Sequence, residues 1–327
     1  MLQALVRKAG RLFDSLHRSL FRFGRHVTTP PAAGGLDSGS RRHGQETTAY
    51  ANLQRVLLTD GVGRTLFEEY AGHRRERGED ETGWVLLGLR DAKEAVVLAT
   101  LPAGALADSG ATHVRFNSEA QALASRVVRQ ADRRLSIVGV VHTHPGSLRH
   151  PSDGDFRGDR EWVANLRGRE GVFGIGTADG PGTPGAMFAH QLRPNVQCWG
   201  DLRFSWYALA AGDADYRPVP VEVTYGPDLA RPLHDLWRVL EIHAGRLDRL
   251  YRQLVGVRFE VIADDWGPGL IVVVPLPEGT DAVRVLVRNK EIRYYVERGS
   301  DLLEVDPGEE SVDRAVFLLL AELAAGA

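Results

Sequence analysis

The chain has 327 residues, of which 43% are hydrophobic and 25% are charged, and its formal net charge is −3. This length allows two domains with a sizeable core, and the balanced charge argues against a nucleic-acid partner, because phosphate binding requires an excess of lysine and arginine. The single cysteine, Cys198, excludes an intramolecular disulfide and a cysteine-rich zinc module, and no apolar run approaches the roughly 20 residues of a membrane span, so we expect a cytoplasmic protein.

Residues 1–27 predict a basic amphipathic helix. Apolar residues such as Leu5, Leu12 and Leu16 recur at helical spacing, and six lysines and arginines accompany the single acid Asp14. Such a helix can lie on an anionic membrane, bind in a partner's groove or pack on the chain's own body, and the sequence leaves these alternatives open. Residues 28–49 are rich in proline, glycine, serine and threonine, which predicts a flexible linker.

Residues 50–213 alternate apolar strands with amphipathic helices, which is typical of an α/β domain built around a core sheet. Strands are predicted at 55–59, 83–89, 95–101, 113–117, 135–142 and 171–178, with further strands within 186–192 and 199–208. Helices are predicted at 64–75, 118–134 and 154–167.

Residues 214–327 predict a smaller α+β domain. A long helix over 228–255 precedes four strands at 257–263, 269–276, 282–289 and 292–298, and a helix capped by Ser311 ends the domain. The short turns between the strands indicate an antiparallel meander. No recognised catalytic cluster lies here, so we expect an accessory module that binds substrate or a partner.

The stretch HTHPGSLRHPSDGD, from His142 to Asp155, follows a buried strand and predicts a metal site. His142 and His144 are two residues apart on a strand, so their imidazoles point to the same side. Ser152 and Asp155 are one turn apart at a predicted helix start, and Asp155 can return to give a third ligand. Two histidines, one carboxylate and a water form an open catalytic zinc site.

Such a site also requires a base. We favour Glu81, at the entry to a predicted core strand, with Glu79 and Asp80 as rivals. Ser152 could donate a hydrogen bond to the oxyanion. Each feature also has a simpler interpretation: histidine pairs occur by chance, Ser152 is a common helix cap, and the charged loop can be merely solvated. The order and spacing together favour a site.

The combination of Glu81, His142-Thr143-His144, Ser152 and Asp155 resembles the JAMM motif of the metal-dependent MPN domain, as found in bacterial deubiquitinase-like JAB domains. Pro145 fits the same pattern. Trp84 departs from it, because many bacterial members have a second glycine there. The resemblance covers about residues 50–212.

This resemblance implies a cytidine-deaminase-like sandwich and a zinc peptidase that cuts isopeptide or peptide bonds after a ubiquitin-like tail. By analogy, His142, His144 and Asp155 hold Zn²⁺, Glu81 is the base and Ser152 steadies the oxyanion. It also implies a ubiquitin-like protein or its conjugate as substrate, activating and conjugating enzymes as partners, and a setting such as anti-phage defence.

Two alternatives remain. The family contains scaffolds that lack the ligands, whereas this chain keeps every polar position. A DNA-repair-associated relative of the RadC type shares a His-x-His-Pro pattern, but the nearly neutral charge argues against it.

Overall fold

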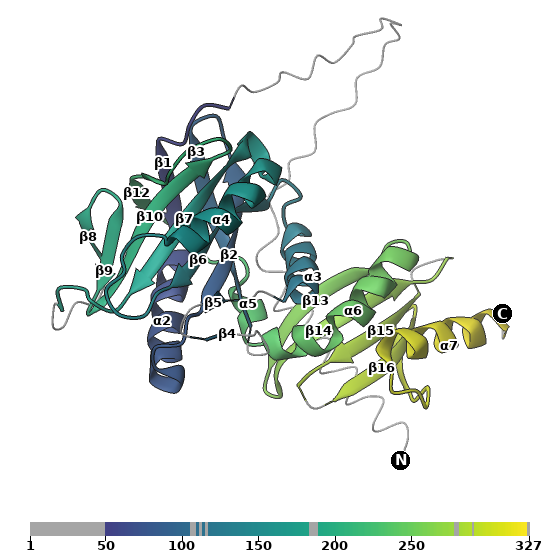
Figure 1. Ribbon diagram of the computed structural model, residues 1–327. Coiled ribbons are helices and arrows are strands. Elements are labelled where there is room, and N and C mark those ends of the chain that lie inside the picture. The colour runs from purple at the N-terminus through teal and green to yellow at the C-terminus, as the bar shows by residue number, and fades with distance from the viewer. Residues whose placement is uncertain are drawn as a thin grey trace, which may run out of the picture.

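The computed structural model in Figure 1 describes residues 50–104, 109–110, 113–114, 117–182, 189–277, 281–289 and 291–325. The predicted basic helix at 1–27 and the predicted linker at 28–49 lie outside these ranges. Within them, none of the helices combines the length and the apolar character that crossing a membrane demands.

A mixed sheet dominates the first part of the described chain, and it confirms the predicted α/β class. Its strand order is β12-β1-β3-β2-β6-β7-β10-β9-β8, with β11 beside β10. The strands are β1 (Arg55–Thr59), β2 (Gly83–Arg90), β3 (Glu94–Pro102), β6 (Ser136–Thr143), β7 (Glu170–Thr177), β8 (His190–Arg193), β9 (Val196–Trp199), β10 (Leu202–Ala210), β11 (Arg217–Pro218) and β12 (Val221–Thr224). The short strands β4 (Ser109–Gly110) and β5 (His113–Val114) form a separate ladder.

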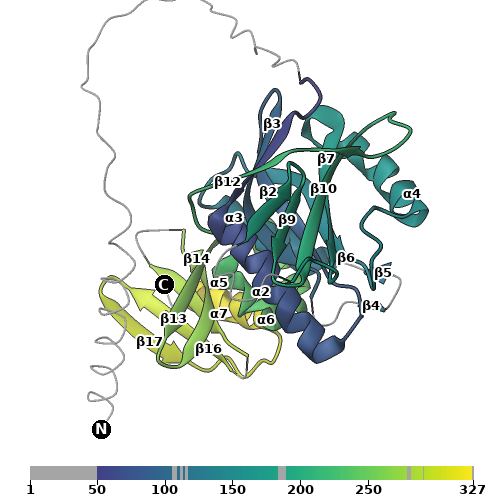
Figure 2. The ribbon, with the colours of Figure 1, turned by 90° about the vertical axis from the view of Figure 1, so that its left-hand side faces the viewer.

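Helices cover both faces of this sheet, and Figures 1 and 2 show α2 (Asp60–Arg77) and α4 (Asp153–Trp162) on opposite sides. Alternate residues of β2 explain this arrangement. Trp84 and Leu86 pack in the core beneath α2. Val85 and Leu87 pack on the other face, beneath α3 (Ser118–Arg129). Helix α2 begins earlier than predicted because Thr59 caps it by accepting a hydrogen bond from the Val62 N–H.

The second part contains a five-stranded antiparallel sheet with two long helices packed on the same face. Its elements are α5 (Arg231–His234), α6 (Trp237–Gln253), β13 (Arg258–Asp264), β14 (Gly267–Pro275), β15 (Ala282–Val287), β16 (Ile292–Arg298), β17 (Asp301–Val305) and α7 (Val312–Ala325). The prediction of four strands was wrong, because the largely exposed edge strand β17 has no apolar alternation. The single helix predicted at 228–255 is two helices.

The two parts share one hydrophobic core. Leu123 and Val127 of α3 belong to the same buried cluster as Leu240 and Leu247 of α6. The Gln130 side chain also pairs with the backbone of β13. The large sheet extends past residue 213, since β12 pairs in parallel with β1. The division into domains at 213 stays a prediction, but the sheet itself ends at Thr224.

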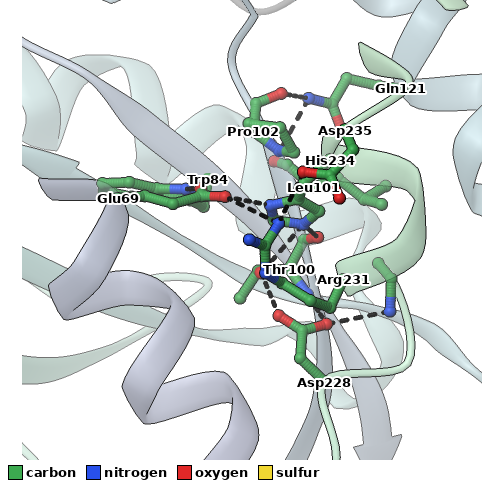
Figure 3. A network of polar contacts seen from close by, with 11 residues as sticks. Glu69, Trp84, Thr100, Leu101, Pro102, Gln121, Asp228, Arg231, His234 and Asp235 are labelled. Atoms are coloured by element: carbon green, nitrogen blue, oxygen red, sulfur yellow. Dashed lines mark hydrogen bonds and ion pairs between the residues drawn. The ribbon is translucent and has the colours of Figure 1, made fainter. Parts of the chain in front are cut away.

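A buried polar network fixes α5 against the large sheet, as Figure 3 shows. His234 donates from Nδ1 to Oε1 of Glu69 over 2.5 Å, and its Nε2 lies 2.7 Å from the carbonyl oxygen of Thr100. Asp228 accepts a hydrogen bond of 2.5 Å from the Thr100 hydroxyl. Both ring nitrogens of His234 face oxygen atoms that can accept a hydrogen bond, an arrangement that favours the doubly protonated ring and raises its pKa.

Candidate metal centre

Three predicted ligands converge at the end of β6. Nε2 of His142 lies 2.9 Å from Nε2 of His144. Oδ1 of Asp155 lies 3.2 Å from Nε2 of His142, and Oδ2 lies 3.3 Å from Nε2 of His144. A tetrahedral zinc ion with bonds of about 2.0–2.1 Å has ligand atoms about 3.3 Å apart. The spacing of these three side chains therefore fits a small tetrahedral metal ion.

The strand and the loop after it orient the two imidazoles. His142 lies within β6, which pairs with β2 on one side and β7 on the other. His144 follows the strand, and its backbone N–H donates to the carbonyl oxygen of Gly176 over 2.8 Å. Nδ1 of His144 lies 3.0 Å from the carbonyl oxygen of Leu148. Donation from Nδ1 to this carbonyl leaves the Nε2 lone pair for a metal, as is typical of histidine ligands.

Asp155 is positioned by the first turn of α4. Ser152 is the N-cap, and its Oγ accepts from the Asp155 N–H over 3.2 Å. The Asp155 carboxylate returns to the Ser152 N–H over 2.6 Å, which completes a capping box. Burial alone would raise the pKa of Asp155, but hydrogen bonds from His142 and His144 hold it far below its usual range. The carboxylate is therefore ionised, as a metal ligand must be.

Ser152 thus has the capping role that its sequence context suggested. A hydroxyl that accepts a hydrogen bond still has its own hydrogen to donate. Its predicted role at an oxyanion remains compatible with this geometry and stays a prediction.

The loop between His144 and Ser152 is held by residues that no sequence pattern indicates. Arg149 forms an ion pair of 2.6 Å with Asp179. The Tyr207 hydroxyl donates to the Arg149 carbonyl oxygen and also lies 2.8 Å from Nδ1 of His150. Asp179 and Tyr207 are 30 and 58 residues away from Arg149, and no motif links them. Asp179 follows β7 and Tyr207 lies in β10, and the pairing of β6 with β7 and of β7 with β10 brings both residues to this loop.

Glu81 lies at the same end of the sheet as the ligands. Gly83 pairs with His142 in the antiparallel register of β2 and β6, and continuing that register sets Glu81 opposite His144. The Thr143 N–H donates to the Thr82 carbonyl oxygen over 2.9 Å, which extends the pairing beyond Gly83. Burial would lower the pKa of His144, whereas the carboxylates of Asp155 and Glu81 raise it, with a raised pKa as the net result.

Burial separates Glu81 from its two rivals. Its exposed fraction is only 7%. Glu79 is exposed and Asp80 is half-buried. Trp84, which departs from the family pattern, packs beneath α2 on the other face of the sheet. The tryptophan side chain therefore points to the face of the sheet opposite the metal ligands.

Comparison with known proteins shows which family this part of the chain resembles. Residues 64–190 match the family described as prokaryotic homologs of the JAB domain. The match contains every predicted site residue from Glu81 to Asp155. It confirms the JAMM/MPN resemblance predicted for this part of the chain.

Two other comparisons add little. A search of curated proteins gives no match. Among solved structures, the chain is similar to the solution structure of protein DSY2949 from Desulfitobacterium hafniense, with 17% sequence identity and a TM-score of 0.33. That alignment covers 53% of this chain and 95% of the other.

Proposed function

We propose that the chain is a zinc-dependent isopeptidase or peptidase that cuts after the C-terminal tail of a ubiquitin-like modifier. The observation that supports this most is the convergence of two imidazole nitrogens and one carboxylate beside the buried Glu81. The JAB-family match over the same residues gives the reaction class, by analogy.

The donor set fits zinc and leaves a position for substrate. His142, His144 and Asp155 offer three nitrogen and oxygen ligands, and three protein ligands are typical of catalytic rather than structural zinc. When bound, zinc would supply a Lewis acid that polarises a carbonyl group and lowers the pKa of water.

Glu81 and Ser152 perform the remaining steps in this proposal. The Glu81 carboxylate removes a proton from the attacking water and delivers it to the leaving nitrogen, so that the amine departs neutral. The Ser152 hydroxyl donates to the oxygen that becomes negatively charged during attack. Both residues belong to rigid parts of the fold, Glu81 beside the pairing of β2 with β6 and Ser152 at the start of α4.

The substrate class comes from the family resemblance. The proposed substrate is a ubiquitin-like protein, as a conjugate or as a precursor. Activating and conjugating enzymes for that modifier are the proposed partners, in a bacterial conjugation or anti-phage system.

Comparison of two variants, at Glu81 and at the nearby Glu79, tests the assignment of Glu81 as the base. Glu81→Gln should keep bound zinc and lower the cleavage of a fluorogenic C-terminal amide of ubiquitin, or of the cognate modifier, by about 10²- to 10⁴-fold. Glu79→Gln is the matched control, because Glu79 is exposed on the same loop, and it should retain the wild-type rate. A wild-type rate in Glu81→Gln would refute the role of Glu81.

A further inference from the structure

A groove of about 1690 Å³ lies where the large sheet meets the second part of the chain. Its floor is the face of β2 and β6 that carries Val85 and Val140. One wall is α3, which lies between the large sheet and α6 in Figure 1. The other wall includes residues 251–258, the end of α6 and the turn into β13. Both parts of the chain are therefore needed to form the groove.

The groove carries an excess of positive charge. The arginines that line it are Arg126, Arg129, Arg133, Arg252 and Arg258. Asp248 pairs with Arg126 over 3.0 Å and with Arg252 over 2.7 Å. Among the described residues, the other three arginines have no ion-pair partner, and they are exposed. Asp159 is the one acid among the described residues of the lining, so the groove offers unpaired cations to a ligand.

Apolar side chains are exposed between these arginines. Val255, in the turn after α6, is 95% exposed, Ile137 of β6 is 38% exposed and Tyr251 of α6 is 37% exposed. All three line the groove. Apolar side chains this exposed, beside unpaired cations, are typical of an interaction surface.

The groove leads to the metal centre. Val140 and His142 are two residues apart on β6, so their side chains point to the same face of the sheet. Asp159 lines the groove and lies one helical turn after Asp155 on α4. A ligand in the groove therefore lies on the face of the sheet that carries the metal ligands.

The charge and the apolar surface of the groove distinguish between its candidate ligands. The N-terminal segment of this chain is itself basic, with six lysines and arginines against one acid in residues 1–27, so it would be repelled by the arginines. A nucleic acid would complement the charge, but it would leave the apolar floor of β2 and β6 without an apolar partner. A peptide with both carboxylates and apolar side chains complements both features.

We propose that this groove binds an acidic, extended segment of a partner protein, with its apolar side chains on β2 and β6 and its carboxylates at Arg129, Arg133 and Arg258. The identification of that partner with the substrate rests on the proposed function, whereas the binding itself does not.

Binding of a labelled peptide tests this proposal without any cleavage. The probe is a fluorescein-labelled peptide of four Glu-Val-Gly repeats, with Lys-Val-Gly repeats as the charge control, measured by fluorescence anisotropy on the full chain. Arg129→Glu/Arg133→Glu/Arg258→Glu should weaken binding of the acidic peptide at least tenfold. The matched control is Arg193→Glu/Arg298→Glu/Arg314→Glu, which reverses three exposed arginines away from the groove and should bind like the wild type. Raised salt should weaken wild-type binding, because exposed charges are screened.

Three results would overturn the proposal. The first is that the wild type does not bind the acidic peptide, or binds it no more tightly than the groove variant does. The second is tighter, groove-dependent binding of a single-stranded oligonucleotide of equal charge. The third is self-association in sedimentation that the groove variant abolishes, which would make a second copy the occupant. Asp155→Ala should bind the peptide normally, so loss of catalysis and loss of binding are distinguishable.

Discussion

The indole N–H of Trp84 donates to Oε2 of Glu69 over 2.7 Å, and Oε1 of the same carboxylate accepts from His234. One carboxylate of α2 therefore ties β2, which leads to the metal centre, to α5, which leads to the second part of the chain. Trp84 stands where many bacterial JAMM members have glycine. Its side chain supports this junction on the face of the sheet opposite the ligands.

The Glu69–His234 pair predicts a pH-dependent stability. Burial alone would lower the pKa of His234, but the hydrogen bond that it donates to Glu69 raises this pKa above the usual 6.5. Its contribution to the free energy of unfolding is complete below pH 6.5 and is lost as the pH rises through the raised pKa. Burial would raise the pKa of Glu69, but His234 lowers it below 4.5, so its contribution is lost as the pH falls below that value.

Urea unfolding at several pH values checks this expectation. Wild-type stability should fall as the pH rises above 6.5, and Glu69→Gln should lower stability at pH 6 by about 2 kcal/mol, because it removes a charge-assisted hydrogen bond. In His234→Gln, most of the fall in stability at rising pH should disappear. An unchanged decline in that variant would assign it to other groups.

Ser152 predicts that stability and turnover can be separated. Ser152→Ala should lower the free energy of unfolding by about 1 kcal/mol, because the N-cap acceptor is lost, whereas Ser152→Gly should cost only a few tenths. Both variants lack the hydroxyl, so both should lower turnover by a similar factor, up to about 10²- to 10³-fold. Calorimetry and the fluorogenic assay measure the two effects. Wild-type turnover in Ser152→Gly would leave Ser152 with its capping role alone.

The buried carboxylate of Glu170, far from the metal centre, predicts a large loss of stability when it is removed. Glu170 and Arg90 form an ion pair with side chains that are each 2% exposed, and Glu170 also accepts from the Leu53 N–H over 2.7 Å. Glu170→Ala should cost about 3–5 kcal/mol, because it leaves Arg90 as an uncompensated buried charge. The control is Arg217→Ala, which removes a partner that is 40% exposed and should cost about 1 kcal/mol or less. Similar losses in the two variants, measured by urea unfolding, would contradict this account.

The convergence of His142, His144 and Asp155 was predictable because it follows from local spacing. A strand aims His142 and His144 to one side, and a helix start returns Asp155 towards them. Glu81 was favoured for its place at the entry to a predicted core strand, but its distance from the ligands in the sequence indicates no contact, so Glu79 and Asp80 remained rivals until burial separated them. The Leu148 carbonyl and the Tyr207 hydroxyl escaped prediction, because one is a backbone atom and the other reaches the loop through tertiary pairing.

The fold was predictable where apolar periodicity was strong. The buried strands β2, β6 and β14 lie within a residue or two of their predicted ranges. Strand β17 has mostly exposed side chains, and the short strands β11 and β12 are recognisable only from their pairing with β10 and β1. The break between α5 and α6 is equally hidden, because the apolar pattern continues through Leu233 and Leu236.

The metal content of the purified protein tests the central claim most directly. After exposure to zinc and removal of excess metal, the wild type should hold about one zinc ion per chain, and Asp155→Ala should hold almost none. Asp153→Ala is the matched control, because Asp153 is exposed in the same helical turn, and it should keep the wild-type content. If the folded wild type binds no zinc, the centre is not catalytic, and a scaffold role replaces the proposed peptidase.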